Sequence, residues 1–444
     1  MKKILIANRG EIAVRIIRAC REMGIETVAV YSEADKDALH TKLADEAICI
    51  GPASSAESYL SMERIISATM VSGADAIHPG FGFLSENSKF AELCEQCHIT
   101  FIGPDSATIA RLGNKQEARN TMMEAGVPVI PGSQEAVYTA EEGKKLAEEI
   151  GYPIMIKAAL GGGGKGMREV YTPEEFETAF QTAQKETENA FHDNTMYLEH
   201  LVLHPRHIEF QILADHYGNV VHLGERDCSI QRNHQKLIEE SPSPALSEEL
   251  RSKMGQAAVK AAKAAGYTNA GTIEFLLEKD GSFYFMEMNT RIQVEHPVTE
   301  CVTGIDLIKA QIRIASGEKL MFTQEDIHIT GHAIECRINA ENPEKNFRPS
   351  PGTITDMYLP GGKGVRIDTA IYSGYTIPPY YDSMIAKLIV WAHSRKEAID
   401  KLRSALGEVI IEGVDTNVDY QYGIVNHPDF VNGTTDTDFI RRIS

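Results

Sequence analysis

Several features that would define other classes of protein are missing from this sequence. No apolar stretch approaches the roughly 20 residues that a membrane-spanning helix needs. The opening MKKILIANRGEIAVR is interrupted by Asn8, Arg9 and Glu11 before a signal-peptide core can form. The seven cysteines, an odd number spread over 444 residues, do not form a disulfide framework and fit a reducing compartment. The sequence therefore predicts a cytoplasmic protein with no membrane contact.

Positive charge is also scarce. The chain has 44 Lys and Arg against 63 Asp and Glu, a formal net charge of -19. Broad nucleic-acid binding needs a basic surface that displaces counterions from phosphates, so this balance argues against it. A few local Lys and Arg residues can still hold a small anion. With 43% hydrophobic residues, the chain is long enough for about two to four domains.

The order of apolar runs predicts mixed α/β and α+β architecture. Strand-like and helix-like segments alternate at the start, with a helix expected over about 11–23, which indicates a parallel sheet covered by helices. Asp35 follows the second strand as a ribose-binding acid would, but the turn ANRGEIAVR lacks the G-x-G-x-x-G glycines, so dinucleotide binding is a weak alternative. From about residue 331, short strands and Gly/Pro turns predict a closing antiparallel α+β domain.

A glycine-rich segment follows a strand in YPIMIKAALGGGGKGMREVYT. The strand ends at Lys157, and 161–164 are all glycine, followed by Lys165 and Gly166. A linker does not fit, because β-type runs flank both ends. A Walker A loop does not fit either, because Gly166 stands where Ser or Thr should hold magnesium. The segment predicts a flap that folds backbone N–H groups over phosphates, with the two lysines as cationic partners.

A candidate metal site lies in GTIEFLLEKDGSFYFMEMN. This stretch is typical of two strands joined by a two-residue turn at Asp280–Gly281, a register that places Glu274 opposite Glu287. Facing like charges are destabilising unless something offsets them. The two carboxylates with the carbonyl of Asn289 suit Mg²⁺ or Mn²⁺. A solvated hairpin end with two free carboxylates fits this geometry equally well; the glycine flap upstream favours ATP with its metal.

Polar side chains alternate through FMEMNTRIQVEH, residues 285–296, and would share one side of an extended strand. Arg291 can fork onto an oxyanion, Gln293 can add a hydrogen bond, and Glu295 can accept a proton. A straight strand would separate Glu287 from Glu295 by roughly 26 Å, too far for one small site. We therefore predict a bend over about 290–292.

The chain resembles a biotin carboxylase, the ATP-grasp subunit of biotin-dependent carboxylases. The resemblance covers nearly all of the chain and is carried, in family order, by IANRGEIAVRIIRAC, AIHPGFGFLSEN, ERDCSIQRNHQK, GTIEF, EMNTRIQVEHPVTE, HAIECRINAE and PPYYDSMIAKL. It implies an ATP-grasp fold with an N-terminal Rossmann-like domain over 1–113, an ATP-grasp domain over 114–330 with a mobile lid at about 131–203, and a C-terminal domain over 331–444.

The resemblance also implies roles for individual residues. Those expected at ATP are Lys115, Lys157, Gly163, Gly164, Lys165, Glu199, Val202, His207, Gln231, His234, Glu274, Leu276 and Glu287. Magnesium or manganese would be held by Glu274, Glu287 and Asn289, and bicarbonate by Lys236, Arg291, Gln293, Val294 and Glu295. Arg337 would face the ureido oxygen of biotin, near Phe81. In the implied mechanism Glu295 deprotonates bicarbonate, which attacks ATP to form carboxyphosphate, and the CO₂ released from it carboxylates biotin.

Simpler interpretations exist for single residues: Lys236 as a solvated lysine, His207 as a strand histidine, and Arg337 as the ion-pair partner of Glu335 or Glu341. For the whole chain the alternatives are another ATP-grasp ligase, which would be duplicated if related to carbamoyl-phosphate synthetase, and an inactive ATP-sensing module, which would have lost its base or metal ligands. The sequence departs from the family pattern at Phe81, usually Tyr, and at Ala159, Leu160, Asn233 and Asp436.

The chain has no AMKM-type biotinylation sequence, so a separate biotin carboxyl carrier protein is the expected partner. Because the chain ends without carrier or carboxyltransferase domains, we expect an acetyl-CoA carboxylase subunit that works with carboxyltransferase subunits in fatty acid synthesis. A subunit of another acyl-CoA or pyruvate carboxylase is the alternative, since the final acceptor never touches this chain. The resemblance also implies a homodimer.

Overall fold

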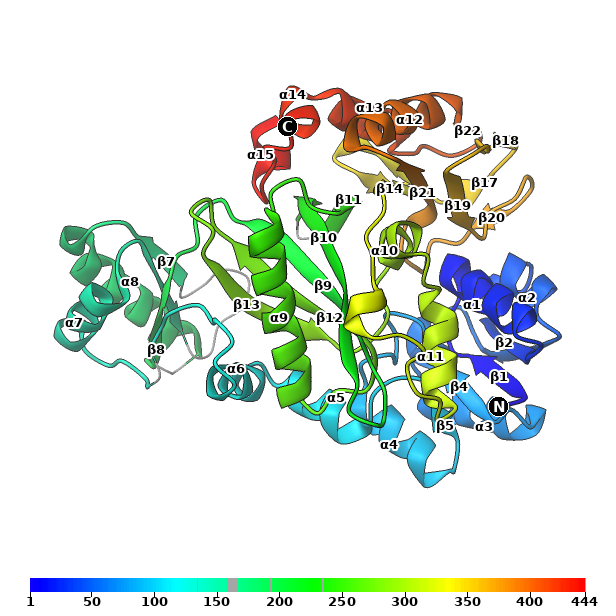
Figure 1. Ribbon diagram of the computed structural model, residues 1–444, viewed down its shortest axis with the longest axis horizontal. Coiled ribbons are helices and arrows are strands. Elements are labelled where there is room, and N and C mark those ends of the chain that lie inside the picture. The colour runs from blue at the N-terminus through cyan, green and yellow to red at the C-terminus, as the bar shows by residue number, and fades with distance from the viewer. Residues whose placement is uncertain (134, 159–166, 192–193, 234, 444) are drawn as a thin grey trace. The chain divides into compact units, whose positions relative to one another are not determined.

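Figure 1 shows the computed structural model of the chain, which describes residues 1–133, 135–158, 167–191, 194–233 and 235–443. The chain divides into two units. The first contains Met1–Val127, Arg206–Phe275 and Glu287–Ser444, and the second contains Pro128–Pro205 and Leu276–Met286.

The N-terminal part of the first unit is a parallel five-stranded sheet, as the alternating pattern predicts. Its strands lie in the order β3-β2-β1-β4-β5, with bounds β1 Lys3–Ile6, β2 Glu26–Ser32, β3 Glu46–Gly51, β4 Ala76–His78 and β5 Thr100–Phe101. The helices of this part are α1 Gly10–Glu22, α2 Leu39–Leu43, α3 Met62–Ser72, α4 Ser88–Gln96, α5 Ser106–Gly113 and α6 Lys115–Glu124. Helix α1 buries Ile12, Ile16 and Cys20 along one face, the i, i+4 spacing of a helix that packs on a core.

Asp35, the residue considered as a ribose ligand, instead binds other side chains of the protein. Arg9 binds it through Nε and Nη2 at 2.6 and 2.8 Å, and the Tyr59 hydroxyl donates to it at 2.6 Å. Its side chain is fully buried. The acid therefore serves as the anchor of an internal hydrogen-bond cluster.

A second, eight-stranded sheet carries the residues of interest. Its order is β13-β12-β9-β10-β11-β14-β21-β19, with bounds β9 Arg206–Ala214, β10 Val220–Arg232, β11 Gln235–Ser241, β12 Asn269–Leu277, β13 Phe283–Asn289, β14 His332–Asn339, β19 Val365–Thr369 and β21 Met384–Ala392. Strand β11 pairs antiparallel with β14, so that Glu239 lies opposite Glu335. The sheet therefore continues across the boundary expected near residue 330.

Helices and short strands complete the first unit. Helix α9 Glu248–Ala264 contacts β9 and β10, and α10 His296–Thr303 contacts β10, β11, β14 and β21. The remaining helices are α11 Leu307–Ala315, α12 Arg395–Glu408, α13 Val418–Asn426, α14 Pro428–Asn432 and α15 Phe439–Ile443. Two-stranded pairs form between β15 Glu341–Asn342 and β16 Arg348–Pro349, β17 Gly352–Thr353 and β20 Thr376–Ile377, and β18 Met357–Tyr358 and β22 Ile410–Ile411. The antiparallel α+β character expected for this part is confirmed.

The second unit contains an antiparallel three-stranded sheet in the order β7-β6-β8, with bounds β6 Ile154–Ala158, β7 Met167–Val170 and β8 Met196–His200. Helices α7 Ala140–Ile150 and α8 Pro173–Phe191 pack on each other, and α8 also packs on β6 and β7. Phe176 and Phe180 stack at 5.6 Å inside this core. The unit thus has a hydrophobic core of its own.

The seven cysteines are all free, as expected from their number and spacing. No helix in the described part of the chain combines the length and the apolar character needed to cross a bilayer.

Two buried histidines of the N-terminal part, His40 on α2 and His78 on β4, predict an acid limit on stability. Burial lowers the pKa of His40 to about 4 and that of His78 to about 3. Both stay neutral in the folded state and take up a proton on unfolding, so their stabilising contribution is present above about pH 6.5 and is lost as pH falls toward 4. We expect His78→Asn, which keeps an acceptor for the Gly80 N–H, to reduce the loss of unfolding free energy between pH 6.5 and 4.5 by about 1–3 kcal/mol. Denaturant titrations at several pH values measure this, with the exposed His98→Asn as control; equal acid slopes in all three proteins would contradict it.

Candidate active site

The hairpin that carries two of the predicted metal ligands has a longer turn than the sequence suggested. Glu278 N–H donates to the Ser282 carbonyl at 2.8 Å, and Gly281 N–H donates to the Glu278 carbonyl at 3.1 Å. The loop is therefore the three residues 279–281, with Gly281 at φ +90°, and the two-residue turn at Asp280–Gly281 is wrong. The register that placed Glu274 directly opposite Glu287 was inferred from that two-residue turn and therefore loses its basis.

The three predicted metal ligands nevertheless lie close together. Burial and then the charge of Glu274 raise the pKa of Glu287, so the two acids repel each other. The Asn289 amide donates to Glu274 Oε1 at 2.8 Å. Lys115, the first residue of α6, lowers the pKa of Glu287 by its charge. Two repelling carboxylates beside an amide are hard oxygen donors of the kind that Mg²⁺ and Mn²⁺ take, so the residues present fit a divalent cation.

Lys236 is the centre of a group of buried acids. Its ammonium lies 2.6 Å from Glu209, 3.1 Å from Glu274 and 2.6 Å from Glu295. The three carboxylates are at most 4% exposed. Burial opposes the charged form of Lys236, but these acids outweigh it and hold the pKa of the ammonium well above its ordinary value. The solvated-lysine interpretation is therefore wrong.

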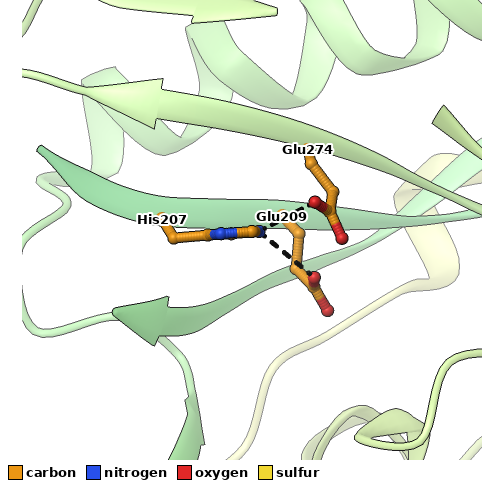
Figure 2. A group of neighbouring side chains, drawn as sticks. All are labelled: His207, Glu209 and Glu274. Atoms are coloured by element: carbon orange, nitrogen blue, oxygen red, sulfur yellow. Dashed lines mark ion pairs between the residues drawn. The ribbon is translucent and has the colours of Figure 1, made fainter. Parts of the chain in front are cut away.

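His207 points toward two of the same acids, as Figure 2 shows. Its Nε2 lies 3.0 Å from Glu274 and 3.8 Å from Glu209, while Nδ1 lies 2.9 Å from the Gln231 amide nitrogen. Glu209 was missed by the sequence analysis. Arg226, which is fully buried, binds Glu209 through Nε at 2.5 Å. The signal for Glu209 was a charged residue between the apolar residues Ile208 and Phe210 of a strand.

The predicted bend after the hairpin is confirmed. Strand β13 ends at Asn289 and helix α10 begins at His296, so that Glu295 lies immediately before the helix. Gln293 donates to Glu274 Oε1 at 3.0 Å, and Glu295 reaches Lys236. The polar residues of 285–296 therefore meet through this turn, as the predicted bend requires.

Arg337 on β14 contacts the carboxylate of Glu295, the candidate base, at the oxygen that Lys236 does not bind. It donates to Glu295 Oε2 at 3.0 Å and to Glu239 Oε1 at 2.6 Å, so the alternative of an ion pair with Glu335 or Glu341 is wrong. Glu239, also missed from the sequence, is fully buried, and burial raises its pKa to about 7. Burial likewise opposes ionisation of Glu295, but Lys236 and Arg337 outweigh it and hold its pKa well below the usual range.

The other predicted residues of the first unit lie along the same turn or near it. Arg291 binds Glu86 at 2.9 Å and Gln293 Oε1 at 2.6 Å. The Val294 carbonyl accepts a hydrogen bond from Lys387 at 2.8 Å. The Phe81 carbonyl accepts one from Asn8 at 2.7 Å, and its ring is partly buried against the apolar core.

In the second unit, Lys157 and Glu199 form an ion pair with each other across β6 and β8. Val202 and Leu276 are half-buried. Gly163, Gly164, Lys165 and His234, with the departures Ala159 and Leu160, lie outside the described residues. Of the other departures, Asn233 is exposed, and Asp436 binds Arg442 at 2.7 Å.

Three family models match consecutive parts of the chain. They are the biotin carboxylase N-terminal domain over 1–109, the ATP-binding domain of the carbamoyl-phosphate synthase L chain over 114–323, and the biotin carboxylase C-terminal domain over 335–442. Biotin carboxylase 1 of Bacillus subtilis is 60% identical over 99% of this chain and 98% of its own length. The chain belongs to the biotin carboxylase family. It is an enzyme, an ATP-grasp ligase that forms a carbon–nitrogen bond.

Two further members of the family show its breadth. A pyruvate carboxylase subunit from Methanothermobacter thermautotrophicus is 56% identical over 99% of this chain and 89% of its own length. The biotin carboxylase domain of Hydrogenobacter thermophilus 2-oxoglutarate carboxylase, solved as a dimer with MgADP, ADP and bicarbonate, has a TM-score of 0.87 and is 52% identical over 99% of this chain and 97% of that one. The family is therefore shared by carboxylases with different final acceptors.

Proposed function

We propose that this enzyme uses ATP and bicarbonate to carboxylate biotin on a biotin carboxyl carrier protein, giving ADP, phosphate and N1′-carboxybiotin. The observation that carries the proposal is the Glu295 carboxylate, 1% exposed and held between Lys236 at 2.6 Å and Arg337 at 3.0 Å. A base flanked by two cations suits a reaction in which an oxyanion is first deprotonated and a second oxyanion then develops.

In the first step, bicarbonate would lie against Lys236, Arg291 and Gln293. Lys236, one of the two cations that neutralise Glu295, would then pair partly with the substrate. Weaker pairing with this cation raises the proton affinity of Glu295, which can take the bicarbonate proton. The carbonate oxygen attacks the γ-phosphorus of ATP, the bond to the bridging oxygen breaks, and carboxyphosphate and ADP form.

In the second step, carboxyphosphate breaks into CO₂ and phosphate. The phosphate removes the N1′ proton of biotin, and the nitrogen attacks CO₂. Negative charge develops on the ureido oxygen, where the Arg337 guanidinium would stabilise it. Preorganised cations in a water-poor site stabilise such charge better than water does.

Glu274, Glu287 and Asn289 would hold Mg²⁺ or Mn²⁺, which when bound neutralises phosphate charge on the nucleotide. Lys115, His207 and Gln231 in the first unit, and Lys157, Glu199, Val202 and Leu276 in the second, are proposed nucleotide contacts, together with Gly163, Gly164, Lys165 and His234. We propose that the segment 131–203 moves as a lid. The second unit supports this, because it has a core of its own.

The metal proposal predicts opposite effects on stability and on nucleotide binding. Glu287→Gln removes one of two repelling acids, so we expect the melting temperature without metal to rise by about 1–4 °C. The same change should weaken Mg-ATP binding about tenfold or more, because a charged ligand is lost. Differential scanning calorimetry and calorimetric titration measure the two effects, with Asp280→Asn at the hairpin tip as control. A lower melting temperature with unchanged Mg-ATP affinity would contradict the proposal.

The proposed reaction is tested by ADP release from ATP with Mg²⁺ and bicarbonate, with and without free biotin. We expect release that requires bicarbonate and increases with biotin. A folded preparation without biotin-stimulated turnover would refute the proposal.

For the final acceptor we propose acetyl-CoA, with carboxyltransferase subunits as further partners and malonyl-CoA for fatty acid synthesis as the product. The M. thermautotrophicus relative supports the alternative of pyruvate. Carboxylation assays with the carrier protein of each complex distinguish them. The dimer reported for the H. thermophilus domain supports a homodimer, which sedimentation would test, and the cytoplasmic location stays a prediction.

A further inference from the structure

Lys387, which was not among the predicted site residues, contacts the turn that carries Glu295. Lys387 on β21 is fully buried, and its ammonium donates to the Val294 carbonyl at 2.8 Å. The same ammonium lies 3.1 Å from Glu11 in the first turn of α1 and 4.0 Å from Asp368 on β19. One charged group therefore connects the N-terminal helix, the C-terminal strands and the turn that carries Glu295.

The sheet register places this lysine beside Arg337. Lys387 lies opposite Arg337 on β14 and opposite Asp368 on β19. Directly paired residues point to the same face of a sheet. Lys387 and the Arg337 guanidinium are thus neighbours on one face, with the lysine supporting the backbone before Glu295 and the arginine contacting its carboxylate.

The turn between β13 and α10 is held at both ends. At its start, Glu86 accepts from the Thr290 N–H at 3.0 Å and from Arg291 at 2.9 Å. At its end, His296 Nδ1 lies 2.8 Å from the Gln293 carbonyl, and Lys387 holds the next carbonyl, that of Val294. The peptide bound by Lys387 leads directly into Glu295, so the lysine fixes the direction in which that side chain leaves the turn.

A buried ammonium such as that of Lys387 is a costly way to hold a turn if its role is only structural. Burial opposes ionisation of Lys387, but Glu11, Glu335 and Asp368 outweigh it and raise its pKa. Buried ion pairs often contribute little net stability compared with apolar residues of the same size, and a specific geometry is one reason for keeping them.

We propose that Lys387, neutralised by Glu11, is a positioning residue that sets the bicarbonate-binding turn of Gln293, Val294 and Glu295. The proposal rests on the proposed function, because it needs bicarbonate to bind at this turn. Its expected signature is a defect in bicarbonate use that exceeds any defect in ATP use. Among the residues that the structure describes, Lys387 contacts Val294, Glu11 and Asp368, and none of these is a proposed nucleotide residue.

The test compares Lys387→Met with the double variant Lys387→Met/Glu11→Gln, in which no charged acid is left at position 11. For both we expect the KM for bicarbonate to rise about tenfold or more and the KM for ATP to stay within twofold. The double variant should recover most of the stability that the single variant loses. Glu11→Gln alone keeps the lysine and should raise the KM for bicarbonate two- to fivefold. Arg251→Met is the matched control: it leaves the buried Glu225, which Arg251 binds at 2.9 Å, without its cation, and should lower stability with unchanged KM for bicarbonate.

A folded double variant with wild-type KM for bicarbonate would overturn the inference and leave the proposed function intact. If neither Lys387 variant folds, a wild-type KM for bicarbonate in Glu11→Gln overturns it. Absence of bicarbonate-dependent ADP release in the wild-type enzyme would instead mean that the proposed function fails.

Discussion

Replacing Glu295 by glutamine should lower biotin-stimulated ADP release about 10²–10⁴-fold, the range typical of losing a general base. The amide keeps the volume of the side chain but takes no proton from bicarbonate. Lys236 keeps Glu209 and Glu274 as partners, and Arg337 keeps Glu239, so no buried cation is left alone. The fold and Mg-ATP binding should therefore persist, which calorimetric titration of the variant measures beside the turnover assay.

A buried acid of the same sheet supplies the control. Glu240 on β11 is paired with His332 at 2.7 Å and with Arg395 at 2.7 Å, and no proposed role is assigned to it. Glu240→Gln should lower stability and leave turnover within about threefold of wild type. Turnover of Glu295→Gln within tenfold of the wild type would show that another group takes the proton.

Much of the fold follows from local patterns in the sequence. The alternation of short apolar strands with helix α1 and its successors was enough to predict the parallel sheet. The bend before Glu295 followed from length alone, since a straight strand would have kept Glu295 away from Glu287. Both predictions rest on geometry that every chain shares.

The turn of the hairpin could not be settled in the same way. Asp-Gly is favoured in two-residue turns, but three-residue loops with glycine in the left-handed position use the same residues. Gly281 at φ +90° fits the longer loop. A difference of one residue changes which side chains face each other. The two acids lie near each other, but the register from which this was predicted rested on a turn that the structure does not have.

The residues that sequence reasoning missed share one property. Glu209, Glu239 and Lys387 are charged residues at fully buried positions of β9, β11 and β21. A charge at such a position is costly unless it is paired, and this was a usable signal for a site. Its partners, however, come from strands distant in the sequence, and only the sheet order brings them together.

Replacing Arg337 by methionine should separate the two halves of the reaction. We expect biotin-stimulated turnover to fall about 10²–10³-fold, as when one preorganised oxyanion donor is lost. The slower, bicarbonate-dependent ADP release without biotin should fall less than tenfold, because Glu295 keeps Lys236 and its place on the turn.

The measurement is ADP release with and without free biotin at saturating bicarbonate, with Arg366→Met as control, an arginine that binds Glu300 and Asp368 instead of Glu295. Removal of Arg337 takes away a cation that pairs with Glu239. Because burial already raises the pKa of Glu239 to about 7, this acid should become protonated in the variant, and no unpaired charge is then left in the interior. Equal losses with and without biotin would assign Arg337 to the bicarbonate step, because its contact with Glu295 would then outweigh any contact with biotin.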